Sequence, residues 1–353
     1  MNMSLRCLLY IILSLLSFSC FSCSQNDFLE DSILYVENDS SQDSIKDSNK
    51  DSINEKNTHK NDSIFKDSTK TSNNMNTNTT YDIDTLFTNN RAYITISKIS
   101  KYMNQSGAGQ GASVHGDYLF HFLDNNSGVN IYNLKEKKHI ERITLQSNEN
   151  NHCNNVSFSN IFYHENDEFP LLYVSGSRVR AYEHVQVYRI TRVNSHFNIT
   201  QVQEITLPTS TSTNGLYWTG VIMDNEDNYM YVYANTGKAH IVKFKIPNPY
   251  EENVTLSDND ILEQFQVEKF THQQGAVMRN GIIYVFDGVP SWGDTNYLRI
   301  IGVKDKKNIA TINITDKGLK AEPEGAFIYN NELYCATNNA GIFKIDFSTA
   351  KED

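Results

Sequence analysis

The stretch Gln274-Gly-Ala-Val-Met-Arg-Asn-Gly-Ile-Ile-Tyr-Val-Phe286 decides the fold, because it recurs along the chain. One further copy begins at Gln110-Gly-Ala and another at Glu324-Gly-Ala. In each copy an aromatic residue follows the glycine after nine positions: Phe120, Tyr284 and Tyr334. Self-similarity at a roughly fixed interval is the sequence sign of a repeat architecture.

Two looser copies fill the gaps in this series. One is centred on Gly220 and the other on Ser159, where a longer turn leads to Leu171-Leu-Tyr173. The five units then start at residues 111, 159, 220, 275 and 325, with spacings of 48, 61, 55 and 50. This is the length of a four-stranded propeller blade with variable loops. The spacing predicts an all-β fold, a β-propeller of about five blades; a sixth blade would have to lie in residues 81–105 or in the longer second and third units.

Each unit predicts four strands. Small residues at the start suit an innermost strand that is crowded at the axis, and a polar turn such as Arg279-Asn280-Gly281 leads to the second strand. Phrases such as Val129–Leu134 and Ile140–Leu145 predict the third and fourth strands. The last unit lacks a fourth strand, and Ala92–Lys98 is expected to supply it and close the ring. In texture, residues 90–347 resemble the YncE-type and quinoprotein-like β-propellers of bacterial exported proteins, without a catalytic signature.

The N-terminus predicts export. A short basic start and an apolar run that begins at Cys7 indicate a signal peptide over residues 1–22. The run ends in Ser17-Phe-Ser-Cys20-Phe-Ser-Cys23, which resembles the lipobox of bacterial lipoproteins. Cys20 follows suitably placed serines, whereas Cys23 precedes the polar residues usual after an anchor, so either cysteine is a candidate for lipidation, with Cys23 favoured. The resemblance implies a Bacteroidetes-like lipoprotein held at the outer membrane, with periplasmic and cell-surface display both open.

Residues 23–80 predict a disordered linker, and residues 81–353 the propeller. The linker is rich in Ser, Asp and Asn and has no strand or helix period, so it cannot bury enough apolar surface to offset its chain entropy. Asp-Ser-Ile or Asp-Ser-Thr recurs in it and resembles the O-glycosylation motif of Bacteroidetes, which implies glycans on Ser32, Ser44, Ser52, Ser63 and Ser68. A plain solvating linker is the alternative.

Composition narrows the choice of partners. The net charge of -11 and the pI near 5.4 argue against nucleic acid, because phosphate binding needs a clustered basic face. Only Cys153 and Cys335 lie in the body of the chain, too few for a disulfide framework, and both are expected to be buried apolar residues.

Residues just before the innermost strands are expected to line one mouth of the ring. These residues are polar and include an aromatic side chain, which suits a glycan, peptide or protein ligand rich in hydroxyls or amides. We therefore expect a binding or scaffold protein without catalytic residues, metal or cofactor; the alternative is a hydrolase or lyase that acts on a glycan or peptide in the mouth. The predicted ligand-binding residues are His152, Asn154, Asn155, Trp218, His272, Gln273, Gln274, Glu322 and Glu324.

Overall fold

The computed structural model describes residues 92–99, 108–124, 128–145, 152–176, 184–208, 218–236 and 238–349. All of them belong to one unit that spans residues 74–353. The predicted signal peptide, both candidate lipid sites at Cys20 and Cys23, and the linker with its five serines lie outside the described residues. No helix among the described residues is long and apolar enough to cross a membrane.

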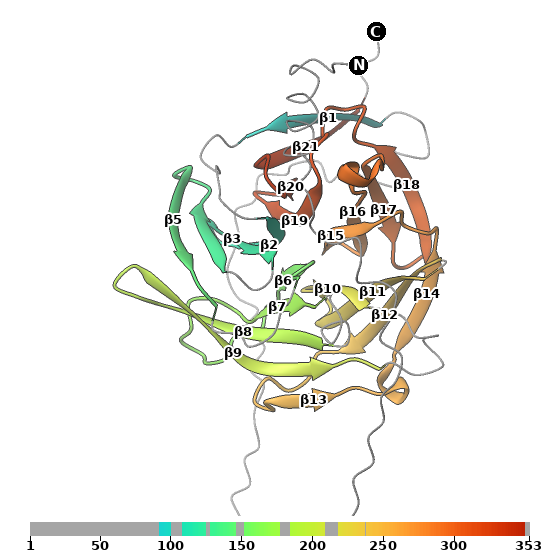
Figure 1. The fold of residues 1–353 in the computed structure, drawn as a ribbon. Helices are drawn as coiled ribbons and strands as arrows, with labels where there is room; N and C mark the ends of the chain where they lie inside the picture. Colours follow the sequence, from blue (N-terminus) through green and yellow to red (C-terminus); the bar gives the residue numbers. More distant parts are fainter. Residues whose placement is uncertain are drawn as a thin grey trace, which may run out of the picture. The chain divides into compact units, whose positions relative to one another are not determined.

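The described strands form five sheets, each built around four antiparallel strands, arranged as the blades of a β-propeller (Figure 1). Blades 1 and 2 contain β2 (Gly109–His115), β3 (Tyr118–Leu123), β4 (Val129–Asn133) and β5 (Lys138–Ile143), then β6 (Val156–Phe158), β7 (Leu172–Ser175), β8 (His184–Val193) and β9 (His196–Thr206). Blade 3 contains β10 (Trp218–Asp224), β11 (Tyr229–Thr236), β12 (Lys238–Lys245) and β14 (Glu263–Val267). Blades 4 and 5 contain β15 (Gln273–Arg279), β16 (Ile282–Asp287), β17 (Tyr297–Gly302) and β18 (Lys307–Asn313), then β19 (Pro323–Tyr329), β20 (Glu332–Thr337), β21 (Ile342–Thr349) and β1 (Ala92–Lys98).

The ring closes as the sequence predicts. The innermost strands β2, β6, β10, β15 and β19 contact one another in that cyclic order. β1 pairs antiparallel with β21 along its whole length, from Ala92 opposite Thr349 to Lys98 opposite Phe343, so a strand from the N-terminal side completes the last blade. The prediction of five blades closed by Ala92–Lys98 is therefore confirmed.

Among the described residues, three short elements lie outside the four-strand pattern. β13 (Asn253–Thr255) lies in the chain between β12 and β14 of blade 3 but pairs in parallel with β9, so that it becomes a fifth strand of blade 2. Two 3-10 helices, η4 (Asp258–Asp260) and η5 (Pro290–Trp292), lie in connections. Turn chemistry follows the predicted pattern: Asn280 and Gly281 both have positive φ, as a two-residue hairpin turn requires.

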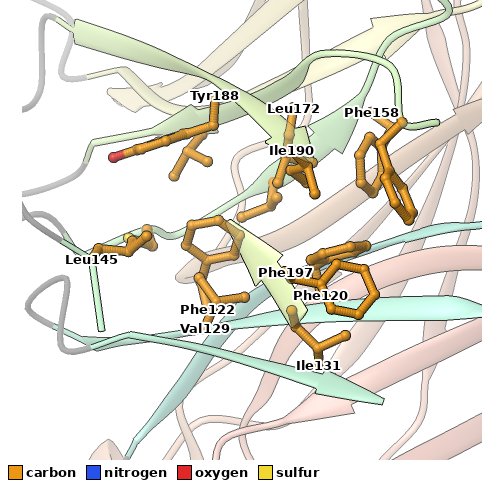
Figure 2. Close-up of a cluster of buried hydrophobic side chains, with 14 residues drawn as sticks. Phe120, Phe122, Val129, Ile131, Leu145, Phe158, Leu172, Tyr188, Ile190 and Phe197 are labelled. Atoms are coloured by element: carbon orange, nitrogen blue, oxygen red, sulfur yellow. The ribbon is translucent and has the colours of Figure 1, made fainter. Parts of the chain in front are cut away.

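Five clusters of buried apolar side chains fill the five blade-to-blade interfaces. Figure 2 shows the cluster between blades 1 and 2, where Phe120 and Phe122 of β3 face Leu172 and Tyr188. Alternate residues of each strand serve opposite faces, so Leu119 packs instead toward blade 5. The core is therefore distributed around the ring, with each blade sandwiched between two neighbours.

Small residues allow the blades to meet at the axis. A Cβ atom on Gly275 would lie 2.5 Å from the carbonyl oxygen of Glu324, and one on Gly325 would lie 2.6 Å from the Cβ of Ala112. Both contacts are shorter than real Cβ atoms tolerate, so these positions require glycine. The Gly-Ala start of the repeat is thus explained by close approach of neighbouring blades.

Candidate functional site

A β-bulge near the start of four innermost strands sets the geometry of the site. Because each innermost strand runs antiparallel to the second strand of its blade, the starts of the first and the ends of the second lie together at one end of the ring. A bulge inserts one extra residue and re-aims nearby side chains. The register shifts lie between Gly109 and Ala112, between Trp218 and Gly220, between Gln273 and Ala276, and between Pro323 and Gly325.

The hydrogen bonds give the second blade a different register from the one that the sequence suggested. Phe158 N–H donates to Ser113 Oγ (3.2 Å), and Met223 N–H donates to Ser157 Oγ (3.1 Å). Ser157 therefore stands in blade 2 where Ser113 stands in blade 1, and the residue equivalent to Gly111 is Asn155. The interpretation of Ser159 as that position was wrong, because the long connection from Ser159 to Leu171 conceals the register.

Asn155 lies at the axis. Its side chain is fully buried, and its Nδ2 donates to the carbonyl oxygens of Val221 in blade 3 (2.7 Å) and Ala276 in blade 4 (3.1 Å). Its Oδ1 accepts from the N–H of Ala276 (2.9 Å). The other four blades have glycine at the equivalent position: Gly111, Gly220, Gly275 and Gly325. Asn155 thus joins three blades, and its polar groups are already engaged within the protein.

Blade 5 contributes two carboxyl groups. Glu324 is buried, and its Oε1 accepts from Gln110 Nε2 of blade 1 (3.2 Å) and Asn338 Nδ2 (3.5 Å). Glu322 accepts from Gln274 Nε2 of blade 4 (3.2 Å) and from Asn338 Nδ2 (3.2 Å). These bonds link blades 4, 5 and 1 through polar side chains.

Burial controls the protonation of both carboxyl groups. It raises the pKa of Glu324 well above its usual range, and the nearby carboxylates of Glu322 and Asp124 raise this pKa further. Burial also raises the pKa of Glu322, although hydrogen bonds from Asn338 and Gln274 and the proximity of His152 and His272 oppose the rise. A protonated Glu324 would have an O–H to donate. Its Oε2 and the Oε1 of Gln110 have no hydrogen-bond partner within the described part of the chain.

Two imidazole–carboxylate pairs lie at the same end of the ring as these carboxyl groups. His272 Nδ1 lies 2.5 Å from Asp294 Oδ2 on the blade 4 side. His152 Nδ1 lies 2.7 Å from Asp124 Oδ1 on the blade 1 side. Both histidines interact electrostatically with Glu322. We call this group the rim site: Gln110, Asp124, His152, His272, Gln274, Asp294, Glu322, Glu324 and Asn338.

The main chain at His272 is held by Asp287, which is fully buried. Its carboxylate accepts the N–H of His272 (2.7 Å) and that of Thr271 (3.0 Å), and it pairs with Arg299 Nε at 2.7 Å. Trp292 stands edge-on to the imidazole of His272, with ring centroids 4.9 Å apart, and is 70% exposed. An exposed aromatic face thus borders a fixed imidazole.

The structure brings together five of the predicted site residues: His152, His272, Gln274, Glu322 and Glu324 all belong to the rim site. Gln273 is half-buried beside them, and Asn154 is buried one residue before the axial Asn155. The backbone of Trp218 lies at the start of β10, but its side chain is outside the described part of the structure.

Sequence reasoning missed four polar or aromatic contributors: Asp124, Asp294, Asn338 and Trp292. Asp124 and Asn338 directly follow the second strands β3 and β20, whose ends lie beside the innermost strands. A polar residue directly after a predicted second strand was therefore a signal in the sequence that could have identified these two side chains. Asp294 and Trp292 come from the connection between β16 and β17, which the repeat does not specify.

Within the described ranges, no group of three or more His, Cys, Asp or Glu side chains is arranged to hold a metal ion. Cys153 and Cys335 are both buried, as expected, and neither is in a disulfide within the described residues.

Neither a protein-family model nor a curated protein matches the chain. Among solved structures, Myxococcus xanthus glutaminyl cyclase is similar with a TM-score of 0.47 and 10% identity, over 73% of this chain and 98% of that chain. An inactive Staphylococcus aureus virginiamycin B lyase with quinupristin is similar with a TM-score of 0.39 and 14% identity, over 72% of this chain and 99% of that chain. A Bacteroides thetaiotaomicron protein of unknown function is similar with a TM-score of 0.42 and 11% identity, over 73% of this chain and 76% of that chain. All three TM-scores lie below 0.5.

Proposed function

We propose that the chain is a binding protein whose rim site takes a hydroxyl-rich ligand, a glycan in particular. The observation that supports this proposal most strongly is the convergence of side chains from three consecutive blades, with the amides of Gln110, Gln274 and Asn338 orienting two carboxyl groups. Hydroxyl groups both donate and accept hydrogen bonds, so they match a mixture of amides, carboxyls and imidazoles.

Trp292 adds an apolar surface to this polar set. Ligand sites combine apolar and aromatic area with a few well-placed polar groups. The exposed face of Trp292, next to His272, provides such area for the less polar face of a sugar ring. Peptide and protein ligands rich in amides meet the same chemistry and form the second ligand class.

We also propose that the propeller is displayed outside the cytoplasm. In this proposal Cys23 or Cys20 carries the lipid that holds the chain at the outer membrane, and residues 23–80 form a stalk glycosylated on the Asp-Ser motifs. Acyl chains contribute roughly 0.8 kcal/mol per buried CH₂, so two or three of them hold a protein firmly.

Glycan-array binding by the purified full chain tests the ligand proposal. Wild type should bind a defined set of glycans, and Glu322→Gln and Trp292→Ala should each weaken that binding by about tenfold, the loss of one good hydrogen bond or one aromatic contact. Glu165→Gln is the matched control, because Glu165 is exposed in the connection between β6 and β7. Equal binding by all four proteins would exclude the rim as the site.

A further inference from the structure

A cleft lies at the outer part of the interface between blades 3 and 4, at the end of the ring opposite the rim site. β11 ends at the rim end, so its first residue, Tyr229, lies at the other end. The outer strands β14 and β18 of the two blades contact each other across this interface (Figure 1). The cleft has a volume of about 510 Å³, which is within the range of ligand sites. It is lined by Tyr229, Lys243, Leu262, Glu263, Gln264 and Lys306.

A row of three side chains crosses blade 3 beside the cleft. Tyr231 of β11 is opposite Lys243 of β12, and Lys243 is opposite Glu263 of β14. Side chains that are opposite one another on neighbouring strands project from the same face of the sheet. Tyr231 belongs to the buried cluster that fills the interface with blade 4, so the whole row projects towards blade 4.

Lys243 is held by aromatic rings. Its Nζ lies 3.7 Å from the ring centroid of Tyr229 and 5.5 Å from that of Tyr231. Its cross-strand neighbour Glu263 pairs instead with Lys306 of blade 4, with 2.6 Å between Oε1 and Nζ. Within the described part of the chain, Lys243 therefore has ring faces as partners and no carboxylate. The rings fix the position of the ammonium group and leave it N–H donors for a ligand.

The charges of the cleft select an anion. Glu263 offsets Lys306, so the ammonium group of Lys243 leaves the lining side chains with one net positive charge, in a chain whose net charge is -11. A carboxylate is a strong partner for such a group, because both members of the hydrogen bond are then charged.

The remaining walls select the body of the ligand. A small inorganic anion would contact only part of a cleft of this size. Leu262 is 47% exposed and offers apolar area together with Tyr229. The amide of Gln264 and the pair of Lys306 with Glu263 offer donors and acceptors that suit hydroxyl groups. A sugar ring combines hydroxyl groups with a less polar face.

We propose that this cleft is a second binding site, which takes an acidic sugar such as a uronic acid, with the sugar carboxylate on Lys243 Nζ. The site shares no residue with the rim site and does not depend on the function proposed for it.

Two ligands that differ in one group test the proposal. p-Nitrophenyl glucuronide carries a carboxylate where p-nitrophenyl glucoside carries a hydroxymethyl group. In a calorimetric titration of the full chain, wild type should bind the glucuronide at least about tenfold more tightly than the glucoside, as for one hydrogen bond between charged groups.

Two variants should change glucuronide binding in opposite directions. Lys243→Met keeps a long side chain against the tyrosine rings but removes the charge, so it should abolish the preference for the glucuronide. Glu263→Gln removes the negative charge from the cleft, so it should tighten glucuronide binding several-fold. Lys269→Met is the matched control, because Lys269 is an exposed lysine just beyond the other end of β14, and binding should be unchanged. Circular dichroism checks that each variant is folded.

Other outcomes would overturn the proposal. Wild type might bind neither ligand or bind both equally, and either result would exclude an acidic-sugar site. Loss of glucuronide binding in Trp292→Ala but not in Lys243→Met would assign the sugar to the rim site and leave the proposed function standing. Binding of acetate, or of the peptide acetyl-Gly-Glu-Gly-amide, as tightly as the glucuronide would show that the cleft takes carboxylates in general or an acidic peptide, and would exclude a sugar-specific site.

Discussion

At the scale of single residues, Asn155 occupies a position where other blades have glycine. The side chain of this one asparagine makes hydrogen bonds to blades 3 and 4. A buried amide is costly unless its donors and acceptors are satisfied. Asn155 satisfies this condition only because three chain segments far apart in sequence meet around it.

Replacing Asn155 by Ala should lower the free energy of unfolding by about 3 kcal/mol, because two carbonyl oxygens and one N–H lose partners in a buried place. Urea denaturation followed by fluorescence measures the change. Asn160→Ala is the matched control: Asn160 is exposed and also donates to a main-chain oxygen of blade 3, that of Asn225, and its loss should stay within about 0.5 kcal/mol. Similar stabilities of the two variants would contradict the axial role of Asn155.

At the scale of elements, the strand β1 completes blade 5 from the other end of the sequence. It pairs with β21 over Ala92–Lys98, and Ile94 inserts into the cluster between blades 4 and 5. A blade finished by a distant strand ties the two ends of the ring together. β13 is a pairing that the repeat does not predict, because three residues between the third and fourth strands of blade 3 pair with the outer strand of blade 2.

We expect Ile94→Ala to destabilise the ring by about 2 kcal/mol or more, the usual cost of removing a large buried aliphatic side chain. Thr95→Ala, on the exposed side of the same strand, should change stability by less than about 0.5 kcal/mol. Chemical denaturation of both variants provides the measurement. If Ile94→Ala matched Thr95→Ala, β1 would not be a closing strand of the core.

At the scale of the whole molecule, the closed ring places a polar rim at one end. Asp124 and Glu324, 200 positions apart in sequence, influence each other electrostatically there. The proposed lipid anchor and stalk would hold this ring away from the membrane. A ligand site on a rigid propeller and a long tether together suit capture of a ligand outside the cell.

The anchor proposal predicts that replacing both Cys20 and Cys23 by Ser moves the protein from the membrane fraction to the soluble fraction. Acyl chains would then be absent, and nothing else in the proposal retains the chain. Fractionation and immunoblotting provide the measurement, and each single variant identifies the acylated residue. Cys7→Ser, within the same export segment, should leave the protein in the membrane. Membrane retention of the double variant would rule out lipid anchoring.

Sequence alone determined the repeat, and with it the class of fold. Three features of the repeat are local: the Gly-Ala start, the polar turn, and the aromatic residue nine positions after the glycine. They are determined by strand crowding, turn geometry and alternating burial within one blade. These features sufficed for five blades and for the closing strand Ala92–Lys98. They also pointed to His152, His272 and Glu324, because residues before the innermost strands gather at one end of any such ring.

Only the tertiary structure decided how these residues are used. Asn155 was expected to face a ligand, but in the structure its side-chain amide forms hydrogen bonds with the main chain of Val221 and Ala276. The pairing of His272 with Asp294, like the burial that raises the pKa of Glu324, depends on loops and on blades distant in sequence. Hydrogen-bond partners and desolvation are set by what surrounds a side chain in space, and a repeat of local patterns carries no record of those surroundings.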